Sequence, residues 1–139
     1  MHTVLVVAHR TLVGNALMEE VKDLAASGPC RFRLLVPVVH PPGHPWTEGE
    51  VQAAARHRLD EGLAQFRELG YEVTGDIGDA NVVDAVTTWL RTNEADEIVV
   101  STLPRRASQW LKWDVPNRLS RTVRVPVTHV VYDEEKVRG

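Results

Sequence analysis

The stretch that decides the fold runs from Ser101 to Leu119, with the sequence STLPRRASQWLKWDVPNRL. It follows an apolar run, Ile98-Val99-Val100, which is typical of a strand covered on both faces. The stretch ends inside a segment with helix-start signals, which predicts a helix over residues 115–122. A buried strand, a long loop and a helix start form the arrangement in which α/β proteins build ligand sites.

The rest of the chain alternates β-branched apolar runs with segments of helical periodicity. We expect strands over residues 3–8, 31–39, 71–77, 98–102 and 127–132, with helices in the intervals between them. Such alternation implies right-handed crossovers and a parallel sheet that is covered by helices on both faces. The sequence therefore predicts one α/β domain over residues 1–139, a three-layer αβα sandwich.

Local signals mark several element boundaries. Thr47 and Glu50 form a capping box at a helix start, and Gly70 stands where a left-handed C-terminal residue is needed. Asp79 is a favourable N-cap for the helix that follows it. Pro37 is expected near the end of the second strand, because proline cannot donate to a central ladder. The helix that starts at Thr47 is expected to bury one stripe, Val51, Ala55, Leu59, Leu63 and Phe66.

The charge balance argues against one class of partner. The formal net charge is −3, whereas a general nucleic-acid binder usually carries a strong basic excess. Positive charge does gather locally, at Arg105-Arg106 and at Arg118, Arg121 and Arg124, so a local anion site stays open. The sequence predicts no nucleic-acid partner.

The compartment is indicated by three further features. The single Cys30 excludes an internal disulfide and is compatible with a reducing environment. No apolar run reaches the roughly 18 residues that a membrane span needs. The chain begins with a strand pattern rather than a signal peptide. We therefore expect a cytoplasmic protein without a membrane partner.

Four segments, in this order and spacing, carry a resemblance to the universal stress protein family. They are VLVVAHRT (residues 4–11), GDANVVDAV (78–86), ADEIVVSTLPRRASQWL (95–111) and VPVTHVV (125–131), so the resemblance covers nearly the whole chain. It implies a five-stranded parallel sheet of order 3-2-1-4-5, of the adenine nucleotide alpha hydrolase-like kind. It also implies a homodimer formed through the last strand, Val127 to Tyr132, which would otherwise be an apolar sheet edge.

Ligands of such sheets bind beyond the carboxyl ends of the strands, where the strand order reverses. His9 lies at this crevice and is the best single candidate for a titratable group that faces a ligand, the alternative being a histidine that caps the strand end. The candidate binding residues at this edge are Ala8, His9, Arg10, Pro37, Val38, Ser101, Thr102, Leu103, Arg105, Arg106 and Val115.

The resemblance breaks at the nucleotide motif. Members of the family that bind ATP carry Gly, two residues, Gly, nine residues, then Gly and Ser or Thr. Counted from Ser101, these positions hold Ser101, Pro104, Asp114 and Val115, so every glycine and the hydroxyl residue are replaced. The Asp that such members often hold after strand one corresponds to His9.

The replacements have physical consequences for a phosphate. A phosphate at a helix start uses free backbone N–H groups and the positive end of the helix dipole. The carboxylate of Asp114 is expected to cap those groups and to repel the ligand, and Pro116 removes one N–H from the first turn. Pro104 stiffens the loop where glycine would let the backbone approach. We therefore expect no cofactor in the usual mode.

Side chains offer an alternative to backbone contacts. Arg105 and Arg106 could bind the phosphates of ATP or AMP in place of glycine amides, or they could simply be solvated. Trp110 and Trp113 could stack on an adenine or face a partner, although such residues more often pack a loop onto its own helix.

Two other kinds of site have little support. His40 and His44 are four residues apart, but in a proline-rich loop this spacing does not bring two imidazoles onto one face, so a metal site is disfavoured. No G-x-S-x-G segment surrounds a serine, and no Walker-type glycine loop is present.

Three functions follow from these patterns. The first is a non-enzymatic stress-response regulatory domain in which nucleotide binding is lost or altered. The second is an adenine-nucleotide binder that uses His9, Arg105 and Arg106, with slow ATP hydrolysis as an option. The third is an interaction module without a ligand and with an unidentified protein partner.

Overall fold

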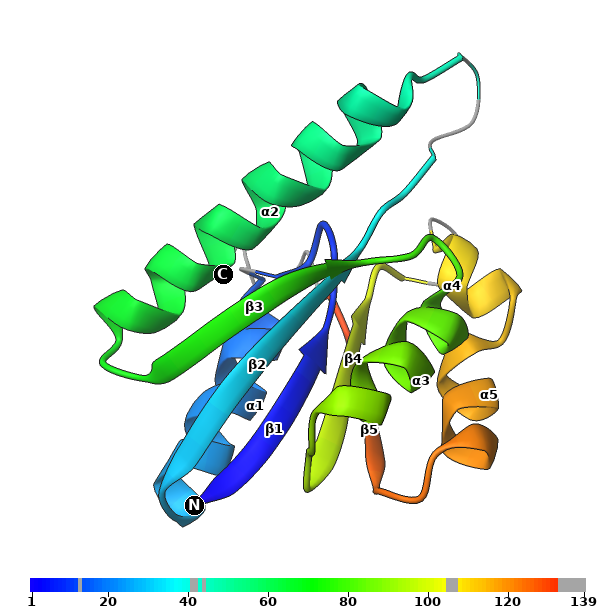
Figure 1. Cartoon of the computed structure of the whole chain (residues 1–139). Helices are drawn as coiled ribbons and strands as arrows, with labels where there is room; N and C mark the ends of the chain where they lie inside the picture. The colour runs from blue at the N-terminus through cyan, green and yellow to red at the C-terminus, as the bar shows by residue number, and fades with distance from the viewer. Residues whose placement is uncertain (13, 41–42, 44, 105–107, 133–139) are drawn as a thin grey trace.

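A five-stranded parallel sheet forms the centre of the protein in this computed structural model, which describes residues 1–12, 14–40, 43, 45–104 and 108–132. The strand order is β3-β2-β1-β4-β5, as the resemblance implied (Figure 1). The strands are β1 (His2–Val7), β2 (Cys30–Pro37), β3 (Glu72–Gly78), β4 (Glu97–Thr102) and β5 (Val127–Val131). The helices are α1 (Asn15–Ser27), α2 (Glu48–Glu68), α3 (Val82–Thr92), α4 (Gln109–Lys112) and α5 (Val115–Thr122).

The sheet is covered on both faces, which explains the uninterrupted apolar runs of its central strands. Val4 and Val6 of β1 pack with residues of α1 and α2, whereas Leu5 and Val7 pack with residues of α3, α4 and α5. All four valine and leucine side chains have no exposed surface. The predicted three-layer sandwich is therefore confirmed, with one hydrophobic core on each side of the sheet.

Helix α2 is longer than the strands it covers. Its amino-terminal half projects beyond the carboxyl ends of the strands (Figure 1). The capping box at its start is confirmed, since Glu50 N donates to Thr47 Oγ1 over 3.1 Å and Thr47 N donates to Glu50 Oε1 over 3.2 Å. After its end, Gly70 has a positive φ of 86°, as the sequence predicted. Pro37 is the last residue of β2.

Three expectations about local structure were wrong. Asp79 does not cap α3. The N-cap is Asn81, whose side chain accepts from Asp84 N, and the side chain of Asp79 accepts from the backbone N–H of Asn81, just before the helix. The buried stripe of α2 contains Gly62, and Leu63 is only partly buried. The loop after β4 also contains the short helix α4, which no start signal predicted. In the part of the chain that the structure describes, no helix has the length and apolarity that crossing a membrane requires.

Candidate functional site

The strand order reverses between β1 and β4, and this is where the candidate residues meet. Beyond β1 the chain turns toward α1 on one face, and beyond β4 it turns toward α4 and α5 on the other. The candidates Ala8, His9 and Arg10 follow β1. Pro37 ends β2 and Val38 follows it, Ser101 and Thr102 end β4 and Leu103 follows it, and Val115 begins α5. Arg105 and Arg106 lie outside the described residues.

Most of the described candidates are too buried to reach a ligand with their side chains. Ala8, Val38, Ser101, Thr102 and Val115 are at most 5% exposed. The side chains of Ala8 and Val38 belong to the core on the α1 and α2 side of the sheet, and that of Val115 belongs to the other core. Of the candidates that the structure describes, only His9, Arg10 and Leu103 are partly or fully exposed.

A hydrogen bond closes the reversal point. Thr11 Oγ1 and Ser101 Oγ share a buried hydrogen bond of 2.7 Å, which joins the turn after β1 to the last residues of β4. Both side chains are at most 3% exposed. Ser101, which lies within β4, thus supplies a hydroxyl that ties the end of this strand to the turn after β1.

The turn after β1 (residues 8–12, called the β1 turn below) is also packed on both flanks. Leu12 is 1% exposed and lies against α2, where a Cβ on Gly62 would come within 2.4 Å of its Cδ2. On the other flank, a Cβ on Gly14 would come within 2.8 Å of the Tyr132 ring. The backbone N–H of Tyr132 donates to Thr102 O over 2.8 Å, which fixes the end of β5 there.

Thr102 directs its hydroxyl toward the sheet edge rather than toward the crevice. Its Oγ1 is 2.8 Å from His129 Nε2 on β5. Burial lowers the pKa of His129, so this imidazole is neutral near pH 7 and is suited to a hydrogen bond with a hydroxyl. The pair joins β4 to the last strand.

His9 differs from these hydrogen-bonded residues. Both of its ring nitrogens are buried, and neither has a hydrogen-bond partner among the described residues. Burial lowers the pKa of His9 to about 4, with further lowering by the charges of Arg58 and Arg10. The predicted alternative, a histidine that caps the strand end, is wrong, because its ring makes no such bond.

Arg58 was not predicted as part of the site. It comes from α2, and the signal in the sequence is its place on the buried stripe, three residues after Ala55 and four before Gly62. A cation on such a stripe points toward whatever the stripe covers, which here is the β1 turn.

Asp114 begins α5 in a way that the sequence did not indicate. It is the N-cap residue but adopts the left-handed conformation (φ 56°, ψ 38°), and its side chain makes no capping hydrogen bond. Capping carboxylates have extended backbones. Its Oδ1 accepts instead from Asn117 Nδ2 over 2.8 Å, and Oδ2 lies 3.7 Å from Arg121 Nη2. The expected occupation of the helix amides is therefore wrong, although a negative charge does stand at the helix start.

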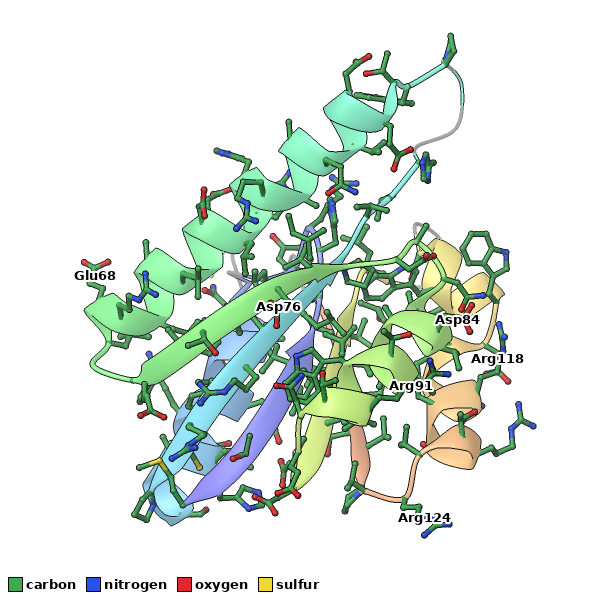
Figure 2. All side chains as sticks on the ribbon, in the orientation of Figure 1. Glu68, Asp76, Asp84, Arg91, Arg118 and Arg124 are labelled. Atoms are coloured by element: carbon green, nitrogen blue, oxygen red, sulfur yellow. The ribbon has the colours of Figure 1, made fainter. Side chains whose placement is uncertain are left out.

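The remaining candidates separate in space. Trp110 is buried in the core beside α5, as the packing interpretation predicted, but Trp113 is 56% exposed. The described arginines of the cluster lie on the layer opposite α2. Figure 2 shows Arg118 on α5 and Arg124 in the turn between α5 and β5, with Arg91 on neighbouring α3. His44 lies outside the described residues, within which no three His, Cys, Asp or Glu side chains could hold a metal ion.

Solved structures with the same architecture identify the fold. A universal stress protein family protein from Arabidopsis thaliana, with AMP bound, superposes with a TM-score of 0.71 at 14% identity, covering 98% of this chain and 95% of that one. The chain has the universal stress protein fold. A family protein from Burkholderia pseudomallei gives a TM-score of 0.63 at 20% identity, covering 91% of this chain and 93% of that one.

A universal stress protein in complex with cAMP also gives a TM-score of 0.63, at 14% identity, covering 93% of this chain and 96% of that one. No protein-family model matches the sequence, and no curated protein matches it significantly. At 14–20% sequence identity, these comparisons show that the universal stress protein fold is shared, and they show the fold alone. The resemblance of the four segments is confirmed at that level.

Proposed function

We propose that this chain is a universal-stress-protein-like regulatory domain of a cytoplasmic stress response, without enzymatic activity and without the family's glycine-loop mode of ATP binding. The observation that carries the proposal is the buried hydrogen bond between Thr11 and Ser101. It joins the β1 turn to the carboxyl end of β4, at the reversal point where ligands of such sheets bind.

The start of α5 supports the same conclusion. The carboxylate of Asp114 stands at this helix start, accepting from Asn117 and lying 3.7 Å from Arg121, and its negative charge opposes a phosphate there. Pro116 removes one of the N–H groups that a phosphate would use. Backbone donors and a favourable field are thus both reduced where the family's motif would provide them.

Native mass spectrometry of freshly purified protein tests this proposal. We expect the mass of the polypeptide alone, in whichever oligomeric state it has. A stoichiometric adduct with the mass of AMP, ADP or ATP would overturn the proposal, because it would mean that the crevice retains a nucleotide through purification.

A second candidate function is adenine-nucleotide binding in an altered mode. Two observations favour it: solved structures of this fold hold AMP or cAMP, and the neutral ring of His9 has an unsatisfied donor and an unsatisfied acceptor at the crevice. Arg105 and Arg106 would then supply the phosphate contacts. This function requires that AMP affinity fall when both arginines become alanine, whereas equal affinity in the double variant would remove it.

The last strand supports a homodimer. β5 is an outer strand of the sheet, and Val131 at its end is 43% exposed. An exposed apolar strand edge is a template for pairing with another chain, and proteins usually cover it. We propose that a second copy of the chain covers β5, and that an unidentified protein partner binds this dimer when no ligand is bound.

A further inference from the structure

The ring of His9 is buried but unsatisfied. Both nitrogens are shielded from water, and no described protein group bonds either one. A buried polar group without a partner costs about 1–3 kcal/mol, so native proteins keep such groups mainly where something other than the polypeptide completes them. At neutral pH one nitrogen of the ring carries a proton and donates, and the other accepts.

Positive charge is concentrated around this ring. Arg10 is its neighbour in the chain, and Arg58 of α2 is close enough for its charge, like that of Arg10, to lower the pKa of His9. The position of Arg58 follows from helix geometry: Gly62, one turn further along α2, is in contact with Leu12 of the β1 turn. Residues four apart on a helix lie on the same side, so Arg58 lies over the same turn.

The charge of Arg58 is only loosely balanced. Among the described residues its ion-pair partner is Glu61, whose Oε1 lies 3.7 Å from Arg58 Nη1. That same oxygen is closer to His57 Nε2, at 3.1 Å. Exposed pairs of this kind contribute little, so the guanidinium remains available to another anion.

We propose that His9, Arg10 and Arg58 form a binding site for a small anion carrying a phosphate group, held between the β1 turn and α2. The imidazole N–H and the guanidinium groups donate to the anion's oxygens, the geometry for which arginine is suited. Arg10 is exposed and the side chain of Arg58 is 38% exposed, so neither side chain is locked in the core and both can rearrange around an anion. This site lies on the α2 side of the sheet edge, not at the start of α5.

Two sources can supply the phosphate, namely inorganic phosphate and a nucleotide. We would titrate the full chain with inorganic phosphate, AMP or adenosine at constant ionic strength and follow the His9 ring signals by NMR. Saturable changes with phosphate and AMP are expected. A stronger response to AMP would assign the nucleotide as the source. A response to adenosine without one to phosphate would overturn the proposal, since the base and not the charge would be recognised.

Arg58→Gln and Arg56→Gln form a matched pair. Both remove one positive charge from α2, but Arg56 is exposed and lies two residues away, on another side of the helix. We expect Arg58→Gln to weaken phosphate binding by roughly tenfold or more, because a hydrogen bond to a charged group contributes about 1.5–3 kcal/mol. In the free protein it should also raise the pKa of His9 above its value of about 4.

Arg56→Gln should change neither quantity. Equal behaviour of the two variants would overturn the proposal, and so would a wild-type protein whose His9 signals do not respond to phosphate. The result is separable from that of the proposed function, because phosphate binding at His9 is read from the ring signals while nucleotide retention is read from the mass of the purified protein.

Discussion

The hydrogen bond between Thr11 and Ser101 gives the sharpest prediction about stability. Thr11→Val keeps the shape of the side chain and removes its hydroxyl, which leaves the buried hydroxyl of Ser101 without a partner. Ser101→Ala does the converse. A buried polar group left unpaired costs about 1–3 kcal/mol, so each single variant should lose about that much free energy of unfolding.

The double variant Thr11→Val/Ser101→Ala should lose much less free energy of unfolding than the two single variants lose together. Neither hydroxyl is then present to be left unsatisfied, and the net worth of a neutral hydrogen bond is only about 1 kcal/mol. The two substitutions should therefore differ from additivity by about 1–2 kcal/mol, which lies within the range measured for contacting residues.

Urea denaturation followed by tryptophan fluorescence and far-UV circular dichroism measures these differences. A loss of about 2 kcal/mol moves the urea midpoint by roughly 1 M in a protein of this size. Thr88→Val serves as a control, since Thr88 is exposed on α3 and its substitution should stay within about 0.5 kcal/mol of wild type. Additive single variants would refute the reasoning, because they would show that the β1 turn and the end of β4 are not joined through these hydroxyls.

Three further predictions concern His9, Asp114 and Val131. The pKa of folded His9, about 4, lies below the 6.5 of an exposed histidine, so below pH 6.5 the unfolded chain takes up a proton that the folded chain does not. Between pH 7 and pH 4 wild type should thus lose about 1–3 kcal/mol more stability than His9→Gln, and parallel urea-derived profiles would contradict this. Asp114→Gly should raise stability by about 0.5–1 kcal/mol, because glycine adopts the left-handed conformation without penalty; a loss in thermal unfolding would mean that the carboxylate matters more than the backbone. Val131→Lys places a charge on the outer strand and should convert a dimer to a monomer in light scattering, whereas a monomeric wild-type protein would exclude the strand-paired dimer.

The sheet and most element positions could be predicted from the sequence because they depend on local patterns. The apolar run before Ser101 and the signals at Val115 gave a strand ending at Thr102 and a helix ending at Thr122, both of which the structure has. The strand order came from the resemblance of four segments, since local patterns do not determine which strands pair.

The features that shape the site could not be predicted in the same way. Thr11 and Ser101 are 90 residues apart in sequence, and only the pairing of β1 with β4 brings them together. The backbone of Asp114 is set by α4 in the preceding turn, where its N–H donates to Leu111 O, and α4 itself lacked a start signal. Arg58 becomes relevant only once α2 is placed over the β1 turn.

The most direct test of the closed crevice is thermal unfolding in the presence of millimolar ATP–Mg. A ligand at about 100 times its dissociation constant adds about 2.7 kcal/mol, which raises the Tm of a chain of this length by roughly 5–10 °C. Magnesium tripolyphosphate at the same concentration controls for anion binding near His9. We predict that ATP–Mg raises the Tm no more than magnesium tripolyphosphate does; a clear additional rise with ATP–Mg would contradict the loss of nucleotide binding.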